Sequence, residues 1–404
     1  MAVGYAGLPA LLPVDGVRIG VTCAGIKKAQ RRDLVLFELA EDSRVAAVFT
    51  RNAFCAAPVV LAKKHLQQQT PRYLLINTGN ANAGTGKSGL VTAEACCDSL
   101  AGLVGCDSSA VLPFSTGVIG EPLPVEKITN ALPELLTSLD AGQWDEAAHG
   151  IMTTDTVAKG ASRQLEVGGQ MITLTGISKG SGMIRPDMGT MLAFIATDAG
   201  IEPALLQEAL REATDRSFNC ITVDGDTSTN DACVLFATGR SGIVLEQGSD
   251  EFLRFAKALQ ALMLELAQLI VRDGEGANKF ITIDVNAGRD VEECRQVAYT
   301  IAHSPLVKTA LFASDPNWGR ILAAVGRAGL SELDLDAITI HLDDVCIVSD
   351  GGRDPAYSEE RGQAVMQHDE ITIRVDLARG DASATVWTCD LSYDYVKINA
   401  EYRS

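Results

Sequence analysis

The sequence predicts a mixed α+β fold in which helices lie outside and β-sheets lie inside a layered sandwich. Strand-length apolar runs and helix-length amphipathic segments come in separate groups, without the strict βαβα alternation of a parallel doubly wound fold. Long helices stand beside pairs of strands, which fits antiparallel sheets covered by helices. The composition is that of a globular protein, with 47% hydrophobic and 21% charged residues.

The first half of the chain is expected to begin with strands and to continue with helices. Apolar or β-branched runs of strand length predict strands at 17–22, 34–39, 46–50, 59–62 and 73–77. A Gly-rich loop over 78–89 follows, and helices are expected at 91–104, 125–138 and 144–152.

The second half alternates shorter groups of each kind. Strands are expected at 163–167, 171–175 and 191–196, with a Gly- and Ser-rich loop over 178–189 between the last two. Helices are expected at 203–216, where Pro203 suits the first turn, and through 252–269, where apolar residues recur at steps of three and four. The pattern then predicts strands at 280–285, 338–342, 345–348, 371–375 and 384–388, and helices at 291–303 and 321–328.

Charge and cysteine usage exclude several classes of protein. The 404 residues carry 34 Lys and Arg against 52 Asp and Glu, a net charge of −18, which is unsuited to nucleic acid or to an anionic membrane surface. The apolar stretch 258–271 is too short and too polar to span a bilayer. Ten scattered cysteines without a CxxC pair, and no secretion signal, indicate reduced thiols in a cytoplasmic protein. The length suggests two or three domains.

Two alternative sites are considered and set aside. The segment 81–88 reads ANAGTGKS, but Ala81 stands where a P-loop has Gly, so a Gly-rich turn is the better interpretation. The five histidines are isolated, and His341 with Asp343 and Asp344 is better explained as a turn than as a metal site. There is no GxSxG elbow of a serine hydrolase.

Three further segments have ordinary explanations when each is taken alone. Thr190 ends the loop 178–189 and opens a strand, as a β-forming residue would. The segment 115–120 is expected to be a turn after a short strand, whose small residues leave backbone N–H groups able to face an oxyanion. Gly274 is expected to cap a helix and Glu275 to be an exposed acid.

Taken together, these segments resemble the ornithine acetyltransferase (glutamate N-acetyltransferase) family of the arginine pathway. The resemblance covers nearly the whole chain and follows the order of the family's motifs. The matching segments are 25–28, 48–52, 77–83, 115–117, 152–156, 179–183, 190–194, 222–231, 274–277, 315–320 and 397–402.

The resemblance implies a self-processing, N-terminal-nucleophile-like architecture. A single precursor would cut itself between Gly189 and Thr190 when the Thr190 hydroxyl attacks the Gly189 carbonyl and water releases the resulting ester. The products would be an N-terminal fragment, 1–189, and a C-terminal fragment, 190–404, which together form one catalytic unit. The family usually has Ala before the Thr, and this chain has the more flexible Gly189.

The resemblance also implies the reaction and its residues. Thr190, activated by its own α-amino group, would take acetyl from N2-acetylornithine and give it to glutamate, while Thr116 and Gly117 stabilise the oxyanion. Lys179 would pair with the substrates' α-carboxylate and Glu275 with a substrate ammonium. The residues implied in substrate contact are Thr156, Lys179, Thr190, Glu275, Asn399 and Ser404, the last standing where the family often has Thr.

No metal and no cofactor is implied, and whether acetyl-CoA also serves as a donor stays open. The implied assembly is a heterotetramer with two copies of each fragment, located in the cytoplasm. Two alternatives remain at this point. A related N-terminal-nucleophile aminopeptidase would share the nucleophile but hydrolyse peptides, and a processed amino-acid-binding protein would leave Thr190 inert.

Overall fold

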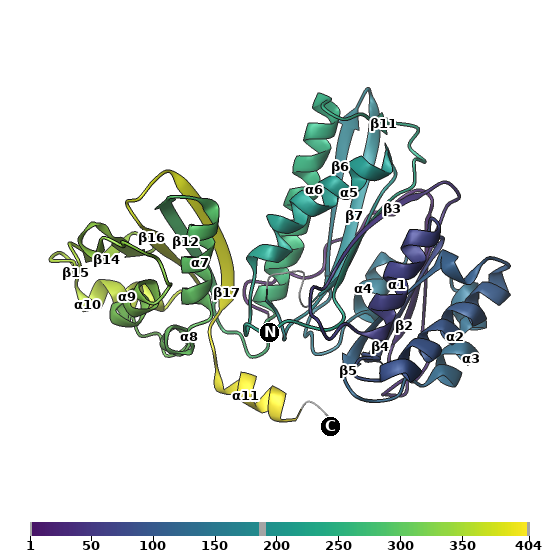
Figure 1. Ribbon diagram of the computed structural model, residues 1–404, viewed down its shortest axis with the longest axis horizontal. Coiled ribbons are helices and arrows are strands. Elements are labelled where there is room, and N and C mark those ends of the chain that lie inside the picture. The colour runs from purple at the N-terminus through teal and green to yellow at the C-terminus, as the bar shows by residue number, and fades with distance from the viewer. Residues whose placement is uncertain (1, 186–190, 402–404) are drawn as a thin grey trace. The chain divides into compact units, whose positions relative to one another are not determined.

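The computed structural model describes residues 2–185 and 191–401 (Figure 1). The chain forms two compact units. The first, which we call the sandwich unit, comprises Gly7–Asn219 and Asp226–Ile270. The second, the C-terminal unit, comprises Met1–Ala6, Cys220–Gly225 and Val271–Ser404. These boundaries differ from the predicted fragments 1–189 and 190–404, which remain a prediction about cleavage.

Within the described part of the sandwich unit, the first sheet has four strands in the order β1-β2-β4-β5. They are β1 (Val17–Thr22), β2 (Leu34–Leu39), β4 (Tyr73–Asn80) and β5 (Val111–Val118). The pairs β1–β2 and β2–β4 are antiparallel, whereas β4 and β5 are parallel, with Thr78 opposite Thr116 and Gly79 opposite Gly117. A parallel pair needs a crossover, and the helix α2 (Gly86–Val104) supplies it.

The second sheet, as far as the structure describes it, has five strands in the order β3-β10-β8-β7-β6. They are β3 (Arg44–Phe49), β6 (Lys159–Val167), β7 (Gln170–Lys179), β8 (Leu192–Thr197) and β10 (Ala232–Ala237). Every residue of β8 and β10 is buried, as is typical of strands covered on both faces. A short parallel pair, β9 (Gly200–Ile201) with β11 (Val244–Leu245), stands apart from this sheet.

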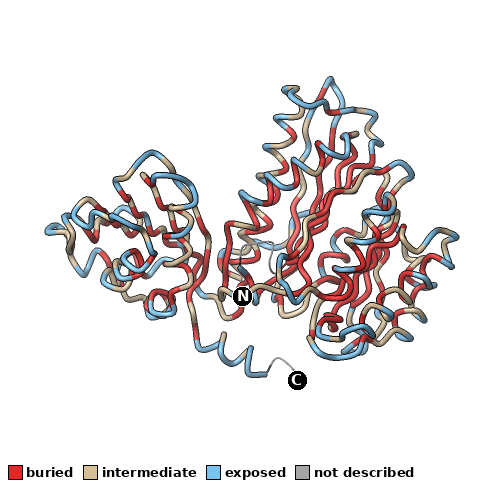
Figure 2. The backbone as a smooth tube through the Cα atoms, viewed as in Figure 1, coloured by how far each residue is buried: buried red, intermediate tan, exposed pale blue. Residues whose placement is uncertain are grey.

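The two sheets pack face to face around an apolar core (Figure 2). Phe37 of β2 has its ring centroid 5.4 Å from that of Phe194 in β8 and 5.8 Å from that of Phe236 in β10. Each such pair contributes about 0.5–1.5 kcal/mol beyond the burial of its area. The short helix α4 (Trp144–Gly150) adds Trp144, whose ring is 5.5 Å from Phe37, to the same core.

Longer helices cover the outer face of each sheet. The outer helices are α1 (Ala57–Gln68), α2 and α3 (Val125–Thr137) on the first sheet, and α5 (Pro203–Asp215) and α6 (Asp250–Arg272) on the second. A Cβ placed on Gly176 of β7 would lie 3.0 Å from a Leu262 methyl and 3.1 Å from a Leu266 methyl, so α6 sits directly on this strand. The predicted sandwich with outer helices is confirmed for this unit, except that α4 inserts between the sheets.

The C-terminal unit is a mixed sheet with helices packed on it. The sheet order among described residues is β15-β14-β13-β16-β12-β17. Its elements are β12 (Phe280–Gly288), β13 (Thr339–Leu342), β14 (Val345–Ser349), β15 (Gly352–Arg353), β16 (Glu370–Asp376), β17 (Ala382–Cys389), α7 (Val291–Ala302), α8 (Pro305–Phe312), α9 (Trp318–Gly326), α10 (Glu359–Met366) and α11 (Tyr393–Ala400). Alternate residues of β12 and β16, such as Ile281 and Ile373, enter one core with the apolar sides of α7, α8, α9 and α10. That alternation marks a sheet with a single helix-covered face.

The structure differs from the sequence prediction at several elements: some were assigned wrongly, and others were not predicted. The expected strand at 59–62 is part of α1, whose buried residues Pro58, Leu61 and His65 recur at helical spacing. Four consecutive apolar residues cannot distinguish a strand from one turn of a buried helix. β10, α8, α10 and α11 were not predicted from the sequence. The segment 115–120 is not a turn throughout, because 115–118 continue β5.

Candidate active site

Thr116 and Gly117 lie at the end of β5, beside the last residues of β4. Gly117 has φ +134°, and a Cβ placed there would lie 2.5 Å from the Asn80 nitrogen and against the Gly79 carbonyl carbon. The register of β4 and β5 shifts at Gly79 and Asn80, where Asn80 lies opposite both Thr116 and Val118. Only glycine permits this close approach of two backbones. The predicted oxyanion residues, Thr116 and Gly117, therefore lie at this close approach of β4 and β5.

Asparagine side chains fix the loop that follows β4. Asn82 N donates to Asn80 Oδ1 at 2.8 Å, and Ala81 N donates to the Val118 carbonyl at 2.9 Å. The Asn230 amide nitrogen, from the chain just before β10, donates to the Ala81 carbonyl at 2.6 Å. The backbone N–H groups of Ala81 and Asn82 are therefore bonded within the protein and are not available to a phosphate. This bonding favours the Gly-rich turn over a P-loop.

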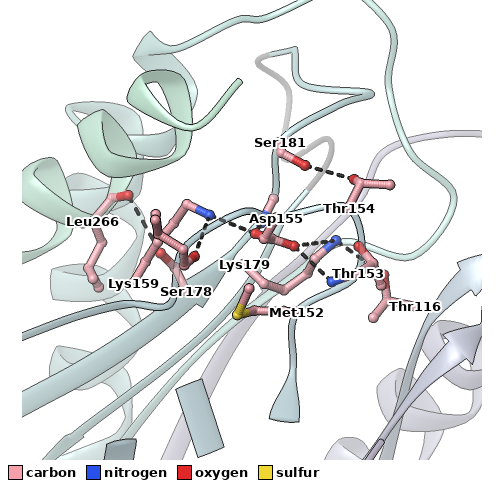
Figure 3. A network of polar contacts seen from close by, with 12 residues as sticks. Thr116, Met152, Thr153, Thr154, Asp155, Lys159, Ser178, Lys179, Ser181 and Leu266 are labelled. Carbon is pink, nitrogen blue, oxygen red and sulfur yellow. Dashed lines mark hydrogen bonds and ion pairs between the residues drawn. The ribbon is translucent and has the colours of Figure 1, made fainter. Parts of the chain in front are cut away.

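A buried charge cluster lies on the other side of Thr116 (Figure 3). Lys159 opens β6 and Lys179 ends β7, and both reach Asp155 in the preceding loop. The Lys159 Nζ lies 2.7 Å from Asp155 Oδ1, and the Lys179 Nζ lies 4.0 Å from Asp155 Oδ2. The side chains of Lys159 and Asp155 are 0% exposed and that of Lys179 is 11% exposed. Charges removed from water in this way are retained only when they are paired.

Backbone donors complete the surroundings of Asp155. Gly180 N donates to Asp155 Oδ1 at 2.7 Å, and Thr153 N donates to Oδ2 at 2.9 Å. Burial alone would raise the pKa of this carboxyl, but the charges of Lys159 and Lys179, with these hydrogen bonds, hold it well below its ordinary value. Asp155 therefore stays ionised and fixes the chain on both sides of the site.

The Lys179 ammonium contacts Thr116 as well as Asp155. Its Nζ donates to Thr116 Oγ1 at 3.4 Å, so β5 and β7 present a hydroxyl and a cation to the same point (Figure 3). The structure thus brings together two of the predicted site residues, Thr116 and Lys179, which are 63 residues apart in the chain. A fixed cation beside a hydroxyl donor suits the stabilisation of a developing oxyanion.

The predicted nucleophile and cleavage junction, Gly189 and Thr190, lie outside the described residues. The chain resumes next to the cluster, because Leu192 of β8 pairs with Lys179 of β7. Met191 is buried and its carbonyl accepts from Ala232 N at 3.1 Å. Thr156 directly follows Asp155 and is exposed.

Two predicted site residues belong to the C-terminal unit. Glu275 is buried, 8% exposed, and not the exposed acid that the sequence suggested. The Asn399 Nδ2 of α11 donates to Glu275 Oε2 at 2.8 Å, so the structure brings these two predicted residues together. Gly276 has φ +71°, and a Cβ there would lie 2.5 Å from the Tyr395 nitrogen, which explains how this loop approaches α11 closely enough to bury Glu275. Ser404 lies outside the described residues.

Sequence reasoning missed the residues that hold the site together. Asp155 and Asn230 lie within segments that carried the family resemblance, but neither had a role assigned. The signal that could have identified them is a polar residue inside a family motif, at a position that the helix and strand patterns do not explain. Lys159 had no such signal, since a lysine opening a strand is normally exposed.

The described residues contain no group of three or more His, Cys, Asp or Glu side chains placed to hold a metal ion. Asp343 and Asp344 form the turn between β13 and β14, with Asp343 at φ +47°, as the sequence predicted. No helix in the described part of the chain is long and apolar enough to cross a membrane.

Comparison with known proteins places the chain in a family. The model of the ArgJ family matches residues 18–404. The chain is 59% identical to the arginine biosynthesis bifunctional protein ArgJ of Pseudomonas syringae pv. tomato over 406 aligned positions, which cover 100% of both chains. A crystal structure of ArgJ from Bacillus halodurans is 41% identical, with TM-score 0.48, and covers 50% of this chain and 95% of that one. Ornithine acetyltransferase of Mycobacterium tuberculosis, solved in complex with ornithine, is 31% identical, with TM-score 0.39, and covers 44% of this chain and 96% of that one. The chain belongs to the ArgJ family.

Proposed function

We propose that this protein transfers an acetyl group from N2-acetylornithine to glutamate, giving ornithine and N-acetylglutamate for arginine biosynthesis. Membership of the ArgJ family supports the assignment. The observation that carries it is the contact between Thr116 and Lys179, a hydroxyl and a fixed cation, of which Lys179 pairs with Leu192 in the strand that follows the predicted nucleophile.

The reaction proceeds in two half-reactions through one ester. The Thr190 hydroxyl adds to the acetyl carbonyl of N2-acetylornithine, and its proton passes to the α-amino group of Thr190. The amide C–N bond then breaks, the proton goes to the leaving nitrogen, and ornithine departs from acetyl-Thr190. The α-amine of glutamate next attacks the ester, and N-acetylglutamate leaves while the Thr190 oxygen regains a proton.

The described residues have distinct parts in this scheme. Thr116 and Gly117 stabilise the oxyanion of each tetrahedral intermediate, at about 2.7–4 kcal/mol for a donor of this kind. Lys179 pairs with the α-carboxylate that N2-acetylornithine and glutamate share. Glu275 receives the substrate ammonium. Thr156, Asn399 and Ser404 complete the contacts to substrate.

Thr190 becomes the N-terminal residue of a fragment when the chain cuts itself at Gly189–Thr190. The strands support a stable product, because β7 precedes the junction, β8 follows it, and the two pair over six positions. In the order β3-β10-β8-β7-β6, the strands β10 and β8 of the C-terminal fragment lie between strands of the N-terminal fragment, so the cut fragments share one sheet. We further propose a cytoplasmic heterotetramer with two copies of each fragment. The chemistry uses protein groups alone and needs no metal or resident cofactor.

The aminopeptidase alternative is less well supported. Peptide hydrolysis requires water to attack the acyl-enzyme, whereas this site offers a cation for the α-carboxylate of an amino-acid acceptor. Nothing in the described residues specifically favours peptide hydrolysis.

Thr190→Ala tests the function and the self-cleavage together. Purified wild-type protein should run as two bands, each near half of 42.8 kDa, and should form N-acetylglutamate from N2-acetylornithine and glutamate. Thr190→Ala should give one full-length band and no transfer. Thr190→Ser, which keeps a hydroxyl, is the matched control and should retain cleavage and part of the activity. Normal cleavage of Thr190→Ala, or peptide hydrolysis without acetyl transfer by the wild type, would contradict the proposal.

A further inference from the structure

The predicted oxyanion residues and the strand that follows the predicted nucleophile belong to different sheets of the sandwich unit. Thr116 and Gly117 lie near the end of β5 in the first sheet, whereas β8, which begins two residues after Thr190, lies in the second. An oxyanion donor is effective only at about 2.7–3.1 Å from the position that the oxyanion will occupy. The contacts that hold the two sheets together at this point therefore bear directly on catalysis.

The Asn230 side chain makes such a contact from the second sheet. Asn230 is buried and lies two residues before Ala232, which opens β10 and pairs with Leu192 of the parallel strand β8. The Asn230 Nδ2 donates to the Ala81 carbonyl after β4 at 2.6 Å and to the Ser115 carbonyl of β5 at 2.9 Å. A side-chain amide has two N–H donors, so Asn230 uses both on the first sheet.

The bond to Ser115 reaches the oxyanion residues through a single peptide unit. The Ser115 carbonyl and the Thr116 nitrogen belong to the same planar peptide. A bond that fixes this carbonyl therefore also fixes the plane from which the Thr116 side chain and the Gly117 backbone continue. Gly117 has φ +134° and no side chain of its own to restrain it, so its conformation depends on such contacts nearby.

Asn230 is itself held in place by hydrogen bonds. The Thr229 Oγ1 donates to the Asn230 Oδ1 at 2.6 Å, which fixes the side of the amide that faces the two carbonyls. The backbone on either side is fixed as well, because Ala56 N donates to the Thr229 carbonyl at 2.9 Å and Thr50 N donates to the Asp231 carbonyl at 3.0 Å. Buried polar groups that are bonded in this way rigidify the part of the protein that they join.

We propose that Asn230 is a positioning residue that fixes the oxyanion site on β5 relative to β8, the strand that follows the nucleophile. This inference rests on the proposed function. Asn230 acts through the Ser115–Thr116 peptide, so its loss should weaken the stabilisation of the oxyanion in both half-reactions. The binding of the substrates' α-carboxylate to Lys179 should stay unchanged.

A donor with sulfur in place of the acetyl oxygen gives a readout of the oxyanion site alone. N2-thioacetylornithine differs from N2-acetylornithine only in the atom that becomes the anion, and sulfur accepts hydrogen bonds weakly. The two donors compete in one reaction, and the loss of each gives the ratio of their kcat/KM values, which we call the oxygen-to-sulfur ratio. This ratio does not depend on the amount of folded or cleaved enzyme. A merely structural role of Asn230 would therefore leave it unchanged.

Asn230→Ala is the main variant. The kcat/KM for N2-acetylornithine should fall at least about tenfold, which is less than the loss of an oxyanion donor itself, because the donors remain but are displaced. The oxygen-to-sulfur ratio should fall by a similar factor, since the thio donor has little oxyanion stabilisation to lose. Thr229→Val keeps the Asn230 amide but removes the hydroxyl that orients it, so the ratio should fall about threefold. This second variant decides the question if Asn230→Ala does not fold or is not cleaved.

The matched control is Thr238→Val, just beyond the opposite end of β10. The buried Thr238 Oγ1 donates to the Asp15 carbonyl at 2.6 Å, so this substitution also removes a buried hydroxyl donor, but one that does not contact Asn230. Its oxygen-to-sulfur ratio should stay at the wild-type value. An unchanged ratio in Asn230→Ala, or in Thr229→Val where Asn230→Ala is inactive, would overturn this inference alone, and so would an equal fall in Thr238→Val. Absence of acetyl transfer by the wild type would instead count against the proposed function.

Discussion

Among the buried lysines of the described residues, Lys159 of the sandwich unit and Lys308 of the C-terminal unit have partners of different kinds. In the sandwich unit, the Lys159 Nζ forms an ion pair with the Asp155 carboxylate at 2.7 Å. In the C-terminal unit, the Lys308 Nζ of α8 donates to Thr388 Oγ1 at 3.0 Å and to the Cys389 carbonyl of β17. Lys308 has no salt bridge with any residue that the structure describes. One cation is thus balanced by a charge and the other by neutral dipoles.

The two lysines therefore have different roles: Lys159 belongs to the candidate active site, whereas Lys308 joins a helix to a strand. The neutral partners of Lys308 join one helix to one strand, and burial raises the pKa of the adjacent Cys389 to about 11, so that its thiol stays protonated. Asp155, in contrast, is shared between Lys159 and Lys179, and Lys179 contacts Thr116. A change at Asp155 should therefore reach the reacting groups, whereas a change at Lys308 should affect only stability.

The largest effect is expected from Asp155→Asn. The substitution keeps the shape but removes the carboxylate that lies 2.7 Å from the buried Lys159 Nζ, which costs about 3–5 kcal/mol in the free energy of unfolding. Lys179 loses its ionic partner at the same time, so kcat/KM should fall at least about tenfold. Urea unfolding and initial-rate kinetics measure the two effects.

A second substitution separates the loss of stability from the loss of function. In Asp155→Asn/Lys159→Met, the buried ammonium that has lost the Asp155 carboxylate is also removed, so part of the unfolding free energy should return. Activity should not return with it, because Lys179 still lacks Asp155. Full recovery of kcat/KM in the double variant would show that Asp155 acts on stability alone.

The sequence predicts the layers of this fold well, because their apolar patterns are local. β1 and β2 have the predicted bounds, and α6 extends its predicted stripe by a few residues at each end. The strand β10 was missed although it is central in its sheet. Its residues are all buried, so it shows no alternation of apolar and polar residues.

The site was predictable only where a motif supplied a role. Thr116, Lys179, Glu275 and Asn399 were placed by resemblance, and the described structure pairs the first two and the last two. The burial of Glu275 depends on the approach of α11 to Gly276, which is a contact over more than a hundred residues. No pattern along the chain encodes such a contact.

Lys308→Met tests whether the buried lysine of the C-terminal unit affects stability alone. Methionine keeps most of the side-chain volume but leaves the Thr388 hydroxyl and the Cys389 carbonyl without their buried donor, which costs about 1–3 kcal/mol. Because these partners are neutral, kcat/KM should stay within about twofold of wild type. Thermal unfolding and the acetyl-transfer assay measure both. A large loss of activity in correctly folded protein would contradict the claim that Lys308 affects stability alone.

The smallest effect is a dependence on pH that only the charged cluster should show. The folded-state pKa of Asp155 is lowered, so its contribution to stability is complete above its unfolded pKa, about 3.9, and is lost as the pH falls toward the folded value. The gap in unfolding free energy between wild type and Asp155→Asn should therefore be constant near neutral pH. Below about pH 4 it should narrow by up to about 1.4 kcal/mol per pH unit. The gap between wild type and Lys308→Met should not change over the same range, because the Thr388 hydroxyl and the Cys389 carbonyl that Lys308 contacts are neutral groups. A gap for Asp155→Asn that stayed constant down to about pH 3 would mean that the pKa of Asp155 is not lowered in the folded protein, and the contrast between the two lysines would then fail.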